Sequence, residues 1–236
     1  MKICIVFDNR SFRPGFVSGW GFSAFLEPPG ILFDTGSETK ALLDNFSLFN
    51  ISLEKIHSIF LSHFHWDHTG GLLGMLPLLQ TPRVFLHSGF SSGFMVEIKR
   101  LRGEPVIIDR PQEIAPDIFS TGPLAGPVPE AGLIIKIKRQ LALLTGCAHP
   151  GILEMVKETK RIFGQSPFLV LGGFHLLRTS HKKALSLACA LREEGVQLAA
   201  PSHCTGEKAL QAFADIFQDG FLEIGAGKVL KLEELS

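Results

Sequence analysis

The segment that most restricts the folds open to this chain is HFHWDH at residues 63–68, which packs three imidazoles and a carboxylate into six residues. It follows directly on IHSIFLS at residues 56–62, a nearly all-apolar run typical of a strand buried on both faces. Two glycines, Gly70 and Gly71, come soon after it. Few structural needs explain so many polar donors at the end of an apolar strand, so we interpret the segment as a functional loop.

The spacing of these donors suits two metal ions. In an extended segment, residues i and i+2 project to the same side, so His63 and His65 can meet one cation. As the chain turns, Asp67 and His68 come to the far side, where they can hold a second cation. Imidazole and carboxylate donors suit Zn(II), our first prediction at one or two ions per chain, and also Fe(II) or Mn(II). Such ions lower the pKa of water from 15.7 toward about 7.

Further histidines follow later apolar runs. His149 lies in TGCAHPG, His175 in LGGFH and His203 in PSHCTG. Because sites in α/β sheets assemble at the carboxyl ends of strands, these residues are able to converge on the 63–68 loop. Two interpretations of His175 stay open: the residue lines a wall of the active-site pocket, or it is an ordinary buried residue that makes hydrogen bonds.

Apolar periodicity predicts strands that alternate with helices in one layered α/β domain over residues 1–236. No polar linker or internal repeat divides the chain. Residues 88–130 are rich in Gly, Pro, Phe and Ser, and we expect an irregular segment that acts as a lid or substrate wall. The strands are expected at 3–7, 20–27, 31–34, 56–62, 83–87, 105–109, 117–120, 132–138, 141–146, 168–175 and 197–206, and the helices at 38–49, 72–79, 151–163, 182–194 and 209–217.

Composition excludes several classes of protein. The 23 Lys and Arg balance the 23 Asp and Glu, so the chain lacks the basic excess of a nucleic-acid binder, and we expect a small-molecule substrate. Four cysteines without a CxxC pair exclude a disulfide scaffold. No stretch has the length of a secretory or membrane-spanning segment, so we expect a cytoplasmic protein without a membrane partner. The oligomeric state cannot be read from these features.

HFHWDH resembles the HxHxDH signature of the metallo-β-lactamase superfamily, and FDTG at residues 33–36 and the later histidines extend the resemblance. Over nearly the whole chain the sequence is similar to the branch named after dihydropterin ribofuranosyl-aminobenzene phosphate synthase, related to methanopterin biosynthesis. The motifs that carry this second resemblance are WGFSAFLE, LFDTG, LSHFHWDHTGGL, LTGCAHPGI, LGGFHL and SHCTGEKAL.

The resemblance implies the metallo-β-lactamase fold, an αββα sandwich of two mixed β-sheets flanked by helices, with the metals at one edge of the sheets. It also implies that Asp34 orients the 63–68 loop without touching a metal. The implied ligands are His63, His65 and His149 for the first metal, and Asp67, His68 and His203 for the second.

The chain departs from the superfamily pattern at one place. Many members have a Gly-Asp element that supplies a bridging carboxylate, whereas this chain has LLTGCAH there. Cys147 can serve instead as a soft ligand, or His149 can complete the site without a bridge.

These features predict a metal-dependent hydrolase that activates water or polarises a small polar substrate of pterin-like or phosphate-bearing type. Asp67 is expected to anchor a metal and orient the water, and His203 to complete the second catalytic metal site. Three alternatives stay open: a synthase step in pterin or methanopterin metabolism, a phosphodiesterase or nuclease, and a non-catalytic metal-binding module.

Overall fold

The computed structural model describes residues 1–236, which divide into two compact units. The first unit consists of Met1–Asp109 and Gly225–Leu235, and the second of Arg110–Ile224 with Ser236. Each unit has one mixed β-sheet with helices packed against it. The prediction of two mixed sheets flanked by helices is therefore confirmed.

The sheet of the first unit has seven strands. Pairing is antiparallel from β13 to β3 and parallel from β3 to β6, so the carboxyl ends of β3, β4 and β5 lie at one edge. The strand order is β13 (Val229–Lys231), β1 (Lys2–Phe7), β2 (Ser23–Glu27), β3 (Ile31–Phe33), β4 (Ser58–Phe60), β5 (Arg83–Leu86) and β6 (Glu104–Ile107).

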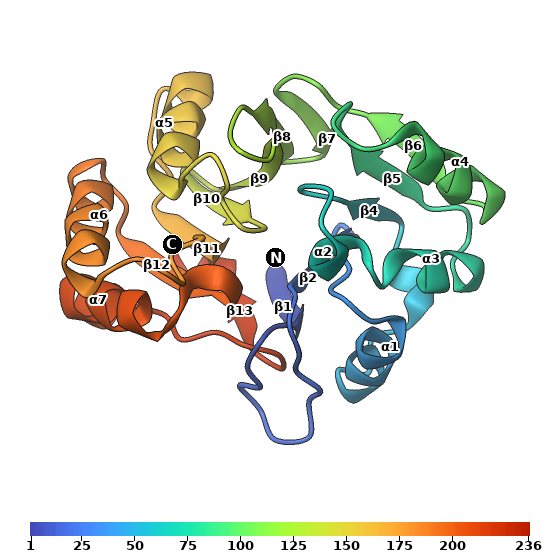
Figure 1. Ribbon diagram of the computed structural model, residues 1–236, viewed down its shortest axis with the longest axis horizontal. Coiled ribbons are helices and arrows are strands. Elements are labelled where there is room, and N and C mark those ends of the chain that lie inside the picture. The colour runs from blue at the N-terminus through green and yellow to red at the C-terminus, as the bar shows by residue number, and fades with distance from the viewer. The chain divides into compact units, whose positions relative to one another are not determined.

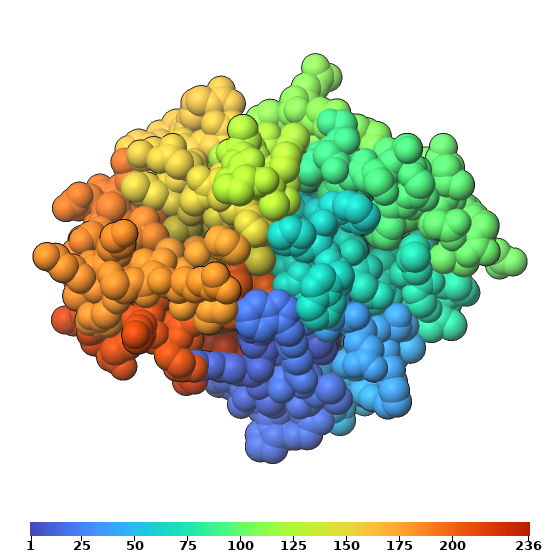
Figure 2. All heavy atoms as spheres, in the orientation of Figure 1, coloured from blue at the N-terminus to red at the C-terminus, as the bar shows by residue number.

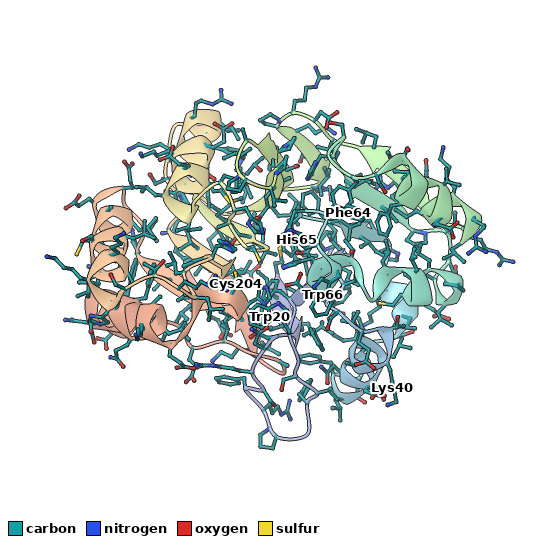
Figure 3. The ribbon with its side chains drawn as sticks, in the orientation of Figure 1. Trp20, Lys40, Phe64, His65, Trp66 and Cys204 are labelled. Atoms are coloured by element: carbon teal, nitrogen blue, oxygen red, sulfur yellow. The ribbon has the colours of Figure 1, made fainter.

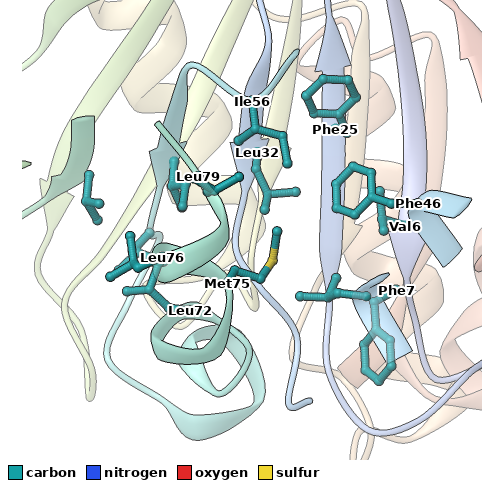
Figure 4. Packing of buried hydrophobic residues seen from close by; sticks show 14 of the residues in the cluster. Val6, Phe7, Phe25, Leu32, Phe46, Ile56, Leu72, Met75, Leu76 and Leu79 are labelled. Atoms are coloured by element: carbon teal, nitrogen blue, oxygen red, sulfur yellow. The ribbon is translucent and has the colours of Figure 1, made fainter. Parts of the chain in front are cut away.

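Helices α1 (Thr39–Leu48), α3 (Leu72–Met75) and α4 (Ser92–Arg100) lie against one face of this sheet (Figure 1). Their apolar side chains and those of the strands form one buried cluster, shown in Figure 4. Asn45 lies among the buried residues of α1, where its side-chain amide donates to the carbonyls of Val6 and Val17 at 2.7 Å. A polar residue fits on this apolar face because its hydrogen bonds are satisfied.

The sheet of the second unit has six strands. Pairing is antiparallel from β7 to β10 and parallel from β10 to β12. Three helices, α5 (Ile152–Phe163), α6 (His181–Glu193) and α7 (Glu207–Phe217), bury their apolar faces in one cluster with this sheet (Figure 1). The strand order is β12 (Leu198–Ser202), β11 (Leu169–Gly173), β10 (Gln140–Thr145), β9 (Glu130–Ile137), β8 (Ile118–Leu124) and β7 (Gln112–Ala115).

Residues 88–130 are more regular than the sequence predicts, because α4, β6, β7 and β8 occupy most of the segment. Helix α4 lies at the surface of the first unit (Figure 2) and buries only Ile98 fully. Ser91 begins the helix, since its hydroxyl accepts the N–H of Phe94 at 3.2 Å. The role of the segment as a lid or substrate wall stays a prediction.

Smaller differences concern the ends of elements. The helix expected over 72–79 is α3 followed by the 3₁₀ turn Leu76–Leu78, where Pro77 lacks the N–H that an α-helix would use. The short elements α2 (Trp66–Thr69), β13 and α8 (Leu232–Leu235) have too few residues to show a sequence period. None of the helices combines the length and the apolarity needed to span a bilayer.

Candidate metal centre

The ligand loop of the first unit, residues 63–68, leaves the carboxyl end of β4 and turns immediately into α2. His65 precedes this short helix, and its carbonyl accepts both the N–H and the hydroxyl of Thr69, at 3.0 and 2.9 Å. These bonds fold the loop back on itself, so that His63, Asp67 and His68 are all buried. Figure 3 shows His65 between Phe64 and Trp66 on this loop.

His63 and His65 face each other through their ring nitrogens, with Nε2 of His63 at 3.1 Å from Nδ1 of His65. Two nitrogens bound to one tetrahedral zinc ion lie about 3.3 Å apart. The two imidazoles therefore have the spacing of a common cation, but not through the extended segment that the sequence predicts: residues 63–64 form a bend, in which the N–H of His65 donates to the carbonyl of His63 at 3.2 Å. On the same loop, Oδ2 of Asp67 lies 3.8 Å from Nε2 of His68.

Asp34 lies fully buried after β3, and its carboxylate organises the loop. Its Oδ2 contacts Nδ1 of His68 at 2.7 Å and accepts the hydroxyl of Ser62 at 2.7 Å, while its Oδ1 accepts the N–H of Ser62 at 2.8 Å. The Ser62 hydroxyl in turn lies 2.9 Å from Nδ1 of His63. Because an ionised Asp34 can only accept, this network places the proton of each imidazole, in its neutral form, on Nδ1 and leaves its Nε2 as the free ligand atom.

Two glycines of the first unit allow the FDTG segment to approach the ligand loop. A Cβ on Gly70 would lie 2.4 Å from the carbonyl oxygen of Ser37, and one on Gly71 would lie 2.3 Å from that of Thr35. Thr35 also donates its N–H and its hydroxyl to the carbonyl of His68, at 2.7 and 3.0 Å. The glycines that follow the histidines in the sequence thus serve this close backbone packing.

The second unit brings three donors together at the carboxyl ends of three adjacent parallel strands. Cys147, His175 and Cys204 each lie two residues beyond the last residue of β10, β11 and β12 respectively. Their sulfur and nitrogen atoms lie within 4.8 Å of one another. Equal offsets from paired strands explain this convergence, since the strand register is continuous from β10 to β12.

His149 and His203 lie at the same edge of this sheet. The ring of His149 packs on that of His175 with centroids 4.4 Å apart, and buried His203 begins the 3₁₀ turn His203–Thr205. Gly173 leaves space for this arrangement, because a Cβ there would lie 2.7 Å from the Cys204 sulfur. The sequence predicts His149 and His203 as ligands and Cys147 as a soft ligand. It places Cys204 beside His203, where closeness to a metal explains the residue more simply than a nucleophilic thiolate does.

His175 and Cys204 influence each other electrostatically. The hydrogen bond with Cys204 raises the pKa of the His175 imidazole, although burial opposes the shift. The hydrogen bond with Cys147, and a weaker one with His175, lower the pKa of the Cys204 thiol well below its usual range, again against burial. By contrast, burial raises the pKa of Cys4, in the core of the first unit, to about 11. Cys204 is therefore disposed to be a thiolate, whereas Cys4 is an inert thiol.

Sequence reasoning missed two residues that hold the donors. Ser62 connects Asp34 to His63, and Glu130 contacts the loop that carries Cys147 and His149. Ser62 lies within the motif LSHFHWDHTGGL, next to an apolar strand and His63, but no role was assigned to it. Glu130 lies in none of the motifs.

Comparison with known proteins agrees with this architecture. The family model described as the metallo-β-lactamase superfamily matches residues 29–152. A 7,8-dihydropterin-6-methyl-4-(β-D-ribofuranosyl)-aminobenzene-5'-phosphate synthase from Methanocaldococcus jannaschii is 30% identical, over 95% of this chain and 94% of its own. An uncharacterised protein of the same organism is 29% identical, over 97% of this chain and 99% of its own.

Solved structures confirm the predicted fold. Tm1679, a metal-dependent hydrolase of the β-lactamase superfamily, matches with a TM-score of 0.85 at 29% identity and covers 98% of both chains. The short form of human tRNase Z matches with a TM-score of 0.67 at 14% identity, over 98% of this chain and 99% of its own. At that identity the second likeness shows the fold alone.

Proposed function

Because this chain belongs to the metallo-β-lactamase superfamily, whose members bind divalent metals, we propose that it is a metal-dependent enzyme acting on a small polar substrate. When bound, such cations supply Lewis-acid chemistry, which polarises a substrate oxygen and makes water more acidic. The proposed ligands form two sets of three: His63, His65 and His149 in the first, and Asp67, His68 and His203 in the second.

The observation that carries this proposal is the hydrogen-bond network of Asp34. A histidine binds a metal through an unprotonated nitrogen, and a carboxylate on its other nitrogen fixes the required tautomer. Asp34 does so directly for His68 and through the Ser62 hydroxyl for His63. This buried network orients two imidazoles so that each can bind a metal through Nε2. A loop with only a structural role does not need this orientation.

The donors favour Zn(II), with Fe(II) and Mn(II) as alternatives. Imidazole suits all three ions, but a thiolate favours zinc, and Cys147 lies in the second unit two residues before His149. We propose Cys147 as an additional soft ligand in place of a bridging carboxylate. Asp67 would anchor a metal and also orient the attacking water by accepting its proton in a hydrogen bond, while His203 completes the second set.

Exposed aromatic side chains beside the ligand loop favour a substrate with a planar ring. Phe64 and Trp66, which flank His65, are 41% and 64% exposed, and Trp20 is 43% exposed. The segment that carries Trp20 lies against the loop, because the N–H of Phe22 donates to the carbonyl of Asp67 at 3.2 Å. Large apolar rings left open to solvent offer stacking surfaces to a flat ligand (Figure 3).

Two reactions remain candidates for this site. Hydrolysis is our first proposal, supported by 29% identity to a metal-dependent hydrolase over nearly the whole chain. A synthase step on a pterin-like, phosphate-bearing compound is the second, supported by 30% identity to the dihydropterin synthase. The balanced charge of the chain argues against nucleic acid as the substrate.

Metal analysis tests the proposal. We expect up to two transition-metal ions per chain after loading with zinc, iron or manganese, and no bound ion would contradict it. His65→Ala should remove bound metal and abolish turnover in a folded protein, because one imidazole of the first set is lost. The matched control is His57→Ala, which removes an exposed histidine outside both ligand sets. Turnover unchanged in His65→Ala would exclude catalysis at this loop.

A substrate screen separates the two reactions. Zinc-, iron- and manganese-loaded forms would be assayed with pterins, phosphodiesters, lactones and thioesters. Turnover of a lactone, thioester or phosphodiester with water supports the hydrolase. Turnover confined to a pterin in the presence of a second substrate supports the synthase.

A further inference from the structure

Glu130 is a fully buried carboxylate in the second unit, and neither ligand set includes it. Its Oε1 accepts the N–H groups of Gly146, Cys147 and Ala148, at 3.0, 2.9 and 2.9 Å. Its Oε2 accepts the N–H of His149 at 2.9 Å. One side chain therefore binds four consecutive backbone N–H groups of the segment that joins β10 to α5.

We propose that Glu130 is a positioning residue, which fixes the aim of His149 and Cys147 toward a metal by holding the backbone of the 146–149 loop. This inference rests on the proposed function, because it assigns to Glu130 the geometry of two proposed ligands. Its place in the fold explains how it reaches the loop. Glu130 begins β9, which runs antiparallel to β10, so the start of β9 lies beside the residues that follow β10.

The backbone of the loop needs such an anchor. Ala148 has a positive φ of 56°, a left-handed conformation that residues with a Cβ rarely adopt. Four successive N–H groups that point to one place form an anion-binding concavity, and buried N–H groups without an acceptor are strongly unfavourable. The carboxylate satisfies all four, and so it selects this loop conformation over the alternatives.

The same contacts direct Glu130 toward the backbone of the loop. Its Oε1 accepts three N–H groups and its Oε2 accepts one, so both oxygens of this buried carboxylate are engaged with residues 146–149. Its negative charge still acts at a distance, as one of the smaller causes that raise the pKa of His175.

Glu130→Gln tests the inference with nearly unchanged side-chain volume. If the amide oxygen takes the place of Oε1, the amide nitrogen faces the N–H of His149, so that two donors oppose each other. If the amide nitrogen instead takes the place of Oε1, the three N–H groups that Oε1 accepts lose their acceptor. We expect zinc affinity, measured by chelator competition, to fall about 10- to 100-fold, as when other supports of metal ligands are removed. The d–d absorption of the cobalt-loaded protein should change as well.

Glu130→Asp and Asn45→Ala complete the set of variants. Glu130→Asp keeps the charge and both acceptors with a shorter side chain, so it should recover part of the zinc affinity lost in Glu130→Gln. Asn45→Ala removes a buried side chain that also bonds to backbone groups, but in the first unit and outside the ligand loop. It controls for a general loss of stability, and we expect its zinc affinity and cobalt spectrum to match the wild type.

The outcomes separate this inference from the proposed function. Wild-type protein that binds no metal overturns both. Wild-type protein that binds metal, with equal affinity and cobalt spectrum in Glu130→Gln, overturns only the role of Glu130. A Glu130→Gln variant that is less stable but keeps its affinity and spectrum also overturns it, because the residue would then be purely structural. If Glu130→Gln does not fold, an unchanged Glu130→Asp protein overturns it.

Discussion

The two units supply their proposed ligands in different ways. In the first unit, His63, His65, Asp67 and His68 lie on one short loop, and their spacing follows from a bend at residues 63–64 and the helical turn α2 that comes next. In the second unit, the donors come from the ends of three parallel strands that are separated by whole helices. The first arrangement depends on local geometry, and the second on sheet register.

Each arrangement also has its own buried carboxylate. Asp34 accepts hydrogen bonds from Ser62, just before the ligand loop, and contacts Nδ1 of His68 within it, whereas Glu130 accepts four backbone N–H groups and sets a loop conformation. Donors that are neighbours in the sequence, as in residues 63–68, thus need their side chains oriented. Donors that come from the ends of separate strands need the backbone of their loops fixed. The following predictions test this difference, from the largest effect to the smallest.

Asp34→Ala should have the largest effect on the metal-free protein. It leaves the buried N–H and hydroxyl of Ser62, and Nδ1 of His68, without their acceptor. We expect the free energy of unfolding, measured with urea, to fall by about 3–5 kcal/mol. The control Asp44→Ala removes an exposed aspartate of α1 and should cost less than about 1 kcal/mol. Equal effects of the two changes would contradict the anchoring role of Asp34.

Gly173→Ala tests the dispersed donors of the second unit. The new Cβ would lie 2.4 Å from the carbonyl oxygen of Gly146 and 2.7 Å from the Cys204 sulfur, so β10 and β12 must both move. We expect unfolding free energy to fall by about 3 kcal/mol, at the upper end of the usual cost of overpacking. A variant as stable as the wild type would show that the strand ends are not closely packed.

The buried thiol of Cys4, in the first unit, should make the free energy of unfolding depend on pH. Its folded pKa of about 11 exceeds its ordinary value of 9.0, so the folded state holds the proton more tightly than the unfolded state. The stabilisation is complete below pH 9 and is lost as the pH rises from 9 to 11. Between pH 8.5 and 10.5 it should fall by about 2 kcal/mol. Urea unfolding of the wild type and of Cys4→Ala should be measured at both pH values. The unfolding free energy of Cys4→Ala should fall by about 2 kcal/mol less than that of the wild type, and an equal fall in both proteins would contradict the prediction.

Gly93→Ala should have the smallest effect and the opposite sign. Gly93 lies near the start of α4, and a Cβ there meets nothing within 4 Å. Alanine favours the helix over glycine, so thermal unfolding should show a gain of about 0.5–1 kcal/mol. Destabilisation would mean that α4 is packed more tightly than its exposure indicates. The pair Gly93→Ala and Gly173→Ala thus separates backbone preference from steric packing.

Much of the fold follows from apolar patterns in the sequence. The runs predicted as strands at 3–7, 31–34 and 56–62 contain β1, β3 and β4, because continuous apolar segments are stable only when a sheet buries them. Helix α4 escaped this reasoning because it lies at the surface and buries a single side chain completely. β13 escaped it because three residues are too few to show a period.

The candidate site was predictable where its residues are neighbours in the sequence. His63 and His65 meet as expected, although a bend closed by the bond from the His65 N–H to the His63 carbonyl brings them together instead of an extended segment. Cys204 was not assigned to a cluster, because its contact with Cys147 spans 57 residues. Glu130 carried no signal at all, because a glutamate before an apolar run is also common at the surface.

Apolar patterns in the amino-acid sequence predict most of the buried strands and helices, and the segment 63–68 shows its four donors directly, because both are local properties of the chain. The carboxylate that meets each loop is set by long-range packing. Asp34 bonds to residues 28 and 34 positions away, and Glu130 to residues 16 to 19 positions away. Such pairings depend on strand order and register, and a buried polar group takes whichever partner that register brings within reach.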